Sequence, residues 1–106
     1  MEINEFQELS TRTMPEGDKN GKANYALGVT GEGGEVADII KKHLFHGHEL
    51  NREKLIEELG DVMHYVSGLA KMFDISLEEI TEYNLNKLKD RYPEGFSKER
   101  SINRVR

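Results

Sequence analysis

Two pairs of carboxylates in this sequence have a spacing that suits chemistry. Glu32 and Glu35 lie three residues apart, and so do Glu58 and Asp61. On a helix this spacing places both members of a pair on one side, where they can share one target. In a chain with 33% charged residues, one such pair arises often by chance, and surface acids are then the alternative interpretation. The presence of two pairs is what favours a common site.

The position of Glu32 favours a metal-ion site. It continues the stripe of Val29 and Val36, where a helix packed against a neighbour should carry an apolar residue. Carboxylates gathered in one small volume raise each other's pKa unless a cation neutralises them. Oxygen ligands favour Mg²⁺ or Mn²⁺ over zinc, and protein-bound Mg²⁺ commonly holds substrate phosphates. We therefore expect Mg²⁺, with Mn²⁺ as a substitute, and a nucleotide or other polyphosphate as the ligand class.

Four helical segments are expected to position these acids, in an all-α bundle with the metal-binding carboxylates on the two central helices. The predicted ranges are 3–13, 22–45, 52–73 and 77–91. An antiparallel hairpin of the second and third helices would bring the acid pairs together at its packing edge. In the third helix, Glu58, Asp61 and Tyr65 form a stripe beside an apolar seam that runs from Leu55 to Phe73.

Turn and capping residues mark the ends of these helices. Residues 16–21 are polar and predict a loop, and Gly47 suits a left-handed position after the second helix. Asn51 is a suitable N-cap for the third helix, and Ser76 with Glu79 fits a capping box before the fourth. Four glycines in residues 28–34 leave a phosphate-cradling loop as an alternative, but the apolar stripe continues through them and favours helix.

Length and composition predict one domain over residues 1–106, in which 97–106 form a basic tail that is solvated or partly disordered. The formal net charge of -5 argues against nucleic acid as the main partner. There is no cysteine, and no apolar run approaches the roughly 20 residues that a membrane span requires. The N-terminus lacks the pattern of a signal peptide. We expect a soluble, unprocessed, cytoplasmic protein that gains stability by forming a homo-oligomer.

Basic and imidazole side chains add weaker candidates. Asn84, Lys87 and Arg91 share one stripe of the fourth helix and could hold phosphate, although basic residues near a helix C-terminus also complement its dipole. Lys42, beyond Glu35, is open to the same two interpretations. His43, His46 and His48 are more typical of surface or capping residues than of a zinc site. His64 follows Asp61 by three residues, but the second half of a di-iron motif is missing.

Beyond the acid pairs, several stretches of this chain resemble one family. The pattern Glu-x-x-Glu, then 22 residues, then Glu-x-x-Asp across a helical pair is similar to the all-α nucleoside triphosphate pyrophosphohydrolases that include MazG-like proteins. The resemblance extends over residues 26–96 and to the N-terminal helix of single-domain members. It implies Mg²⁺-dependent hydrolysis of a nucleoside triphosphate, NTP or dNTP, to the monophosphate and pyrophosphate, as a house-cleaning activity on the nucleotide pool.

The resemblance also assigns roles to residues. Glu32, Glu35, Glu58 and Asp61 would hold the metal, with Glu35 as the general base. Tyr65 and Asn84 would contact the nucleotide, and Lys87 and Arg91 the phosphates, with Lys42 a further candidate for the substrate. Family members form dimers or tetramers, so a homodimer or homotetramer is expected. The chain has no tryptophan, which some members use in the base pocket, so its base preference is open. Phosphoribosyl-ATP pyrophosphohydrolase and a non-enzymatic helical binding module are the alternatives.

Overall fold

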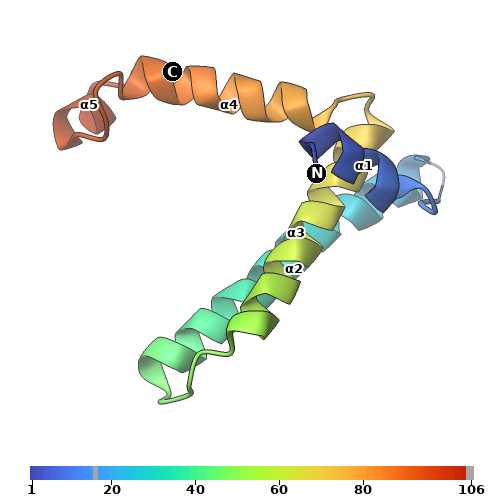
Figure 1. The fold of residues 1–106 in the computed structure, drawn as a ribbon, viewed down its shortest axis with the longest axis horizontal. Coiled ribbons are helices and arrows are strands. Elements are labelled where there is room, and N and C mark those ends of the chain that lie inside the picture. The colour runs from blue at the N-terminus through green and yellow to red at the C-terminus, as the bar shows by residue number, and fades with distance from the viewer. Residues whose placement is uncertain (16, 105–106) are drawn as a thin grey trace.

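The chain folds into helices, which the computed structural model describes for residues 1–15 and 17–104 (Figure 1). In chain order they are α1 (Ile3–Thr11), α2 (Lys19–Phe45), α3 (Arg52–Met72), α4 (Leu77–Arg91) and the short α5 (Lys98–Ile102). The predicted all-α class and its four main helices are confirmed. Helices α2 and α3 pack along each other as a hairpin. Helix α1 lies across the C-terminal end of α3, away from the loop that joins α2 to α3.

Short polar side chains begin these helices. Asn51 Oδ1 accepts a hydrogen bond from the Lys54 backbone N–H at 3.1 Å, and Ser76 Oγ accepts one from Glu79 N–H at 3.0 Å, as the sequence predicts. Helix α2 begins three residues earlier than expected, because Asp18 Oδ1 accepts a bond from Gly21 N–H. Part of the predicted loop 16–21 is therefore helical. The left-handed position after α2 is confirmed, since Gly47 has φ +75°.

The glycine-rich stretch of α2 is continuous helix, so the phosphate-loop alternative is wrong for this segment. Two glycines allow the hairpin helices to approach closely. A Cβ on Gly28 would run into the ring of Tyr65, and a Cβ on Gly68 would run into the ring of Tyr25. In contrast, a Cβ on Gly31, Gly33 or Gly34 would meet nothing within 4 Å. Close packing within one chain thus explains Gly28 but not Gly31, Gly33 or Gly34.

The side of α3 that faces α2 is not its apolar seam. Tyr65 and Gly68 contact α2, and Glu58 is buried in the same hairpin. Leu59, 46% exposed, and Phe73, 57% exposed, both belong to the seam. The stripe of Glu58, Asp61 and Tyr65 therefore faces α2, although it was predicted to lie at the edge of that contact. Leu59 and Phe73 of the apolar seam remain exposed.

A corner formed by α1, α3 and α4 fixes the start of α4. Gln7 Nε2 donates to the backbone oxygens of Ser67 and Ile75, and its Oε1 accepts from Leu77 N–H at 3.1 Å. Asn4 Oδ1 accepts from the backbone N–H of Glu78 at 3.0 Å. Side chains of α1 thereby satisfy N–H groups that the first turn of α4 leaves without helical partners.

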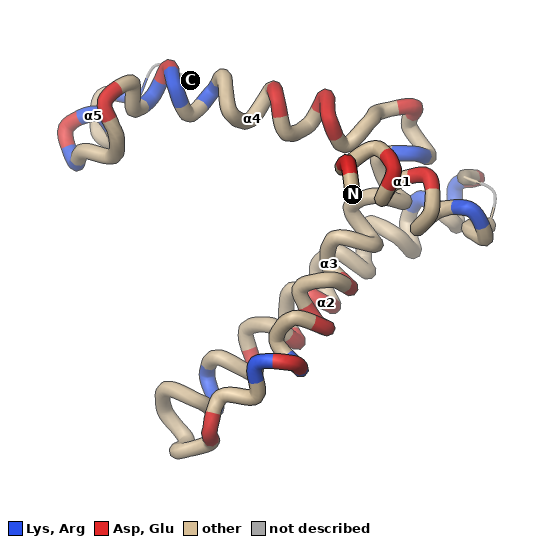
Figure 2. Tube along the Cα trace, viewed as in Figure 1, with Lys and Arg blue, Asp and Glu red and all other residues tan. Residues whose placement is uncertain are grey.

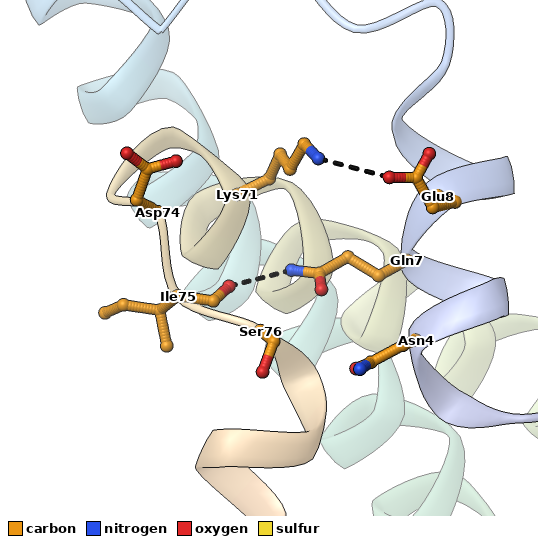
Figure 3. A pocket seen from close by; sticks show the side chains of 7 residues that line it. All are labelled: Asn4, Gln7, Glu8, Lys71, Asp74, Ile75 and Ser76. Carbon is orange, nitrogen blue, oxygen red and sulfur yellow. Dashed lines mark hydrogen bonds and ion pairs between the residues drawn. The ribbon is translucent and has the colours of Figure 1, made fainter.

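Figure 3 shows the cavity of about 250 Å³ at this corner. It is lined by Asn4, Gln7, Glu8, Lys71, Asp74, Ile75 and Ser76. The amide of Gln7 reaches across it to Ile75, and Lys71 pairs with Glu8 at its rim. These contacts join α1 to the turn between α3 and α4, so the cavity belongs to the structural corner.

Beyond the corner, α4 projects away from the hairpin as an arm (Figure 1). At its far end, residues 98–102 of the predicted solvated or partly disordered tail form α5, whose side chains are mostly exposed and whose first turn is capped by Ser97 Oγ at the backbone N–H of Arg100. The Arg100 guanidinium donates to the carbonyl oxygens of Asp90 and Arg91 and so closes the C-terminal end of α4. Positions 105 and 106 of the predicted tail lie outside the described residues.

The projecting arm makes the chain extended. Its radius of gyration is 16.7 Å, against about 13 Å for a compact domain of this length. Its accessible surface is 8110 Å², against about 6,100 Å² for a compact monomer of this mass. Within the described residues, no helix combines the length and apolar character needed to cross a membrane.

Candidate metal centre

Three of the predicted carboxylates converge in the middle of the hairpin. Glu32 of α2 and Glu58 and Asp61 of α3 each offer an oxygen, and these atoms all lie within 4.8 Å of one another. Glu58 is buried, and the other two are half-buried. Figure 2 shows the acidic residues of both helices along this part of the hairpin. We refer to Glu32, Glu58 and Asp61 as the carboxylate cluster.

The pKa values of two carboxylates in the cluster are shifted in opposite directions. Burial raises the pKa of Glu32, with further contributions from a hydrogen bond to Glu58 and from the negative charge of Asp61. The pKa of Glu58 is lowered, chiefly because its Oε1 accepts a hydrogen bond from Lys54 Nζ at 3.0 Å. The ammonium group of Lys54 therefore offsets the charge of Glu58, while Glu32 remains under the repulsion of its neighbours.

The donor set suits a hard divalent cation. The three groups are carboxylates from two rigid helices, and the chain contains no thiol that would favour a softer metal. A cation among them would relieve the repulsion that raises the pKa of Glu32. The residues present therefore fit Mg²⁺ or Mn²⁺.

The segment that carries this cluster matches a known family. Residues 20–96 match the MazG nucleotide pyrophosphohydrolase domain. This chain belongs to that family. It is also 42% identical over 79 residues to the gene 37 protein of Mycobacterium phage L5, in an alignment covering 71% of this chain and 69% of the phage protein. No solved structure matches the chain. Membership of the MazG family implies nucleotide pyrophosphohydrolase activity.

Glu35, the remaining acid of the MazG-like pattern, stays outside the cluster. Its side chain is exposed, although its charge still contributes to the raised pKa of Glu32. A three-residue step advances a helix by about 4.5 Å and turns it by about 60° from the starting direction, so the two members of a pair need not reach the same point. Farther along α2, exposed Lys42 forms an ion pair of 2.9 Å with Asp38.

Tyr65 contributes to packing beside the cluster. Its ring lies edge-on to the ring of Tyr25, with centroids 5.1 Å apart, and edge-on to His64 at 5.3 Å. The same ring fills the space left by Gly28. The structure thus gives Tyr65 a place in the hairpin core next to the carboxylates.

The other predicted substrate contacts lie on the arm. Asn84, Lys87 and Arg91 are all on α4, which leads away from the carboxylate cluster (Figure 2). About 24 Å of α3 and its turn separate Asp61 from the start of α4, and Lys87 lies about 15 Å further along α4. One copy of the chain does not bring these residues to the cluster.

Two further residues, His43 and Lys54, have contacts that define their roles. His43 Nδ1 bonds the backbone oxygen of His48 at 2.9 Å, which gives this histidine the structural role at the helix end that we favoured. Lys54, in contrast, was not predicted as a site residue, yet its ammonium contacts Glu58. Its spacing of four residues before Glu58 is the signal that could have identified it.

Proposed function

We propose that this MazG-family protein hydrolyses nucleoside triphosphates, NTP or dNTP, to the monophosphate and pyrophosphate, and so removes abnormal or excess nucleotides from the pool. The observation that carries the proposal is the convergence of Glu32, Glu58 and Asp61 from two helices inside the matched segment. Such a centre suits a substrate with several negative charges, since the phosphates of a nucleotide and the carboxylates both prefer the same cation.

In this proposal Glu32, Glu35, Glu58 and Asp61 hold Mg²⁺. When bound, the ion supplies Lewis-acid polarisation of a phosphoryl oxygen and neutralises charge on the substrate. Glu35, which is exposed beside the cluster, accepts the proton of the attacking water as general base. Water adds to the phosphoryl group as the bond between the α and β phosphates breaks, giving the monophosphate and pyrophosphate without a covalent intermediate on the protein.

We further propose that the protein works as a homodimer or homotetramer. Its accessible surface exceeds that of a compact monomer by roughly 2,000 Å², which is the size of a substantial interface. Leu59 and Met63 of α3 and Leu85 of α4 are among its exposed apolar side chains. Self-association would bury this surface and would let the arm of one copy approach the cluster of another.

Such an assembly also offers a role for the substrate residues of α4. Because Asn84, Lys87 and Arg91 cannot reach the cluster of their own chain, a second copy would have to supply them. Tyr65 would contact the nucleotide from the hairpin, and Lys42 would do so from the end of α2 that leads into the loop before α3. The oligomeric state can be measured by sedimentation velocity, in which Leu59→Glu should shift the protein toward monomer and Glu82→Gln should not.

The reaction itself is tested by incubating the protein with a panel of NTPs, dNTPs and phosphoribosyl-ATP, with Mg²⁺ or with EDTA. Chromatography of the nucleotides and a pyrophosphate assay identify the bond that is cleaved. Asp61→Asn should abolish turnover while keeping the helical circular dichroism, and Glu53→Gln, an exposed carboxylate change on the same helix, should not. If folded protein cleaves none of these substrates, the proposal is wrong and a binding module becomes the better interpretation.

A further inference from the structure

An exposed stripe runs along α3 on the side that faces away from α2. Ile56, Leu59 and Met63 are each about half exposed, and Gly60 between them is exposed as well. Their spacing places all four on one face of the helix. At 3.6 residues per turn, this face lies about half a turn from Asp61, whose carboxylate points towards Glu32 of α2. We refer to Ile56, Leu59, Gly60 and Met63 as the α3 stripe.

Gly60 gives this stripe a place for close approach. A glycine inside a helix costs about 1 kcal/mol relative to alanine. A Cβ on Gly60 would meet nothing within 4 Å, so packing among the described residues does not account for it. A second helix backbone that came close to this face would account for it, because glycine has no side chain to hold that backbone away.

An apolar groove continues the stripe towards the C-terminal end of α3. It has a volume of about 190 Å³, and its lining includes Val62, Met63 and Val66 of α3 together with Leu77 and Ile80 of α4. The first turns of α1 and α4 therefore rise beside the stripe at this end. At the N-terminal end of α3, Figure 1 shows only α2 and the preceding loop beside it within the described residues.

We propose that two copies of this chain pair antiparallel through the α3 stripe, about a two-fold axis between Leu59 and Gly60, with Ile56 of each copy entering the groove of the other. The inference rests on the proposed self-association and adds its geometry. Ile56 and Met63 each lie about 5 Å along α3 from the axis, on opposite sides of it. The axis therefore brings Ile56 of one copy opposite Met63 of the other, where the groove begins.

The shape of the chain favours the antiparallel orientation. In a parallel pair, the corner of α1 and α4 on one copy would meet the same corner on the other and hold the two stripes apart. In an antiparallel pair, each corner lies beside the uncovered N-terminal end of the other α3, and the helix dipoles oppose each other favourably. The roughly 2,000 Å² of surface in excess of a compact monomer is enough for such an interface.

Disulfide crosslinking tests the register of the pair, because the chain contains no cysteine of its own. The double variant Ile56→Cys with Met63→Cys should form a linked dimer on mild oxidation, at a concentration where sedimentation shows the reduced variant to be dimeric. Peptide mass mapping should join position 56 of one chain to position 63 of the other. Each single variant should stay unlinked, because identical positions lie about 10 Å apart along the helices, beyond disulfide reach.

A second variant tests the close approach without changing the apolar residues. Gly60→Leu should raise the dissociation constant of the dimer at least about tenfold, because the added side chain separates the two helices. Its helical circular dichroism should be retained, since a Cβ at this position meets nothing in its own chain. Gly31→Leu is the matched control, because Gly31 is an exposed glycine of α2 that also meets nothing within 4 Å. The control should dimerise as wild type does.

Three outcomes overturn the inference. Links between identical positions in the single variants would show that the helices pair in parallel. A dimer that forms no link and is unaffected by Gly60→Leu would have its interface elsewhere, which leaves the proposed self-association intact. Wild type that sediments as a monomer while it hydrolyses nucleoside triphosphates would remove the self-association and this inference together, and would leave the proposed reaction standing.

Discussion

The corner around Gln7 and the carboxylate cluster are two places where polar groups are buried between helices, and they are balanced in opposite ways. At the corner, the neutral amide of Gln7 bonds two carbonyl oxygens and one N–H, and Ser10 Oγ lies 2.9 Å from Ser67 Oγ. At the cluster, three carboxylates share one volume, and among the described residues Lys54 alone forms an ion pair with them. The polar groups at the corner find hydrogen-bond partners within the chain, whereas the carboxylates of the cluster would be stabilised by an added cation.

This difference separates stability from function. A satisfied neutral network stabilises one arrangement of helices and loses free energy when any member is removed. A cluster of like charges costs stability in the metal-free protein, so removing the charge of Glu32, whose pKa is raised, should not destabilise the fold. The contrast between the two regions can be tested by changing one residue in each.

The largest effect is expected from Glu58→Gln, which keeps the shape of the side chain and removes its charge. Turnover of a nucleoside triphosphate should fall by at least about 100-fold, since even the outer partners of metal ligands cost up to that factor when they are changed. The melting temperature in EDTA should change little, because loss of the ion pair between Glu58 and Lys54 is offset by relief of the repulsion that Glu58 exerts on Glu32. Steady-state kinetics and thermal melts measure the two effects, and Glu53→Gln is the control.

The opposite result is expected at the corner. Gln7→Leu should lower the free energy of unfolding by about 3 kcal/mol, because the variant leaves the Leu77 N–H and the Ser67 and Ile75 oxygens without their side-chain partner. Urea denaturation measures this loss. Under conditions where the variant is folded, its affinity for Mn²⁺ should match that of wild type. A stable Gln7→Leu protein would mean that the corner is not what fixes the start of α4.

Local signals in the sequence were sufficient for the helices and for much of the cluster. Asn51 and Ser76 correctly predicted where two helices begin. The apolar stripe of α2 correctly predicted helix through its glycines. The spacing of Glu32, Glu58 and Asp61 on two antiparallel helices was sufficient to predict their convergence. These features depend on periodicity and capping, which are local properties.

What the sequence did not reveal depends on contacts between distant segments. The direction of α4 is set by Asn4 and Gln7, whose bonds to residues 60 or more positions away have no periodic signature. The apolar seam of α3 was expected to face α2, but Gly28 and Gly68 allow Tyr65 and Tyr25 to occupy that contact instead. A glycine allows close helix packing but does not add to the apolar periodicity of the sequence. The apolar periodicity of α3 therefore indicated the wrong face for its contact with α2.

A smaller effect on stability should distinguish Gly28 from Gly31, two glycines of α2. Gly28→Ala should destabilise the protein by about 1–3 kcal/mol, because its Cβ would meet the ring of Tyr65. Gly31→Ala should stabilise α2 by about 0.5–1 kcal/mol, because a Cβ there meets nothing within 4 Å and alanine favours helix. Urea denaturation of both variants tests the pair. Loss of self-association in Gly31→Ala would instead show that a second copy approaches this face.

The smallest expected effect is a dependence of stability on pH that arises from Glu32. Its pKa is raised above the ordinary value of 4.5, so the folded metal-free protein keeps this proton to a higher pH than the unfolded chain does. The resulting stability is complete below pH 4.5 and is lost as the pH rises through the raised pKa. The lowered pKa of Glu58 acts below its own ordinary value of 4.5, so the interval above that pH isolates Glu32.

In EDTA, the melting temperature of wild type should therefore fall relative to that of Glu32→Gln as the pH is raised from 4.5 to neutrality. Glutamine does not titrate, so the variant lacks this loss, and Glu53→Gln should follow wild type. Saturating Mg²⁺ at neutral pH should stabilise wild type more than Glu32→Gln, because ligand binding to the folded state offsets the repulsion. Parallel curves for wild type and Glu32→Gln would show that the three carboxylates do not repel one another in solution, and the contrast between cluster and corner would then be lost.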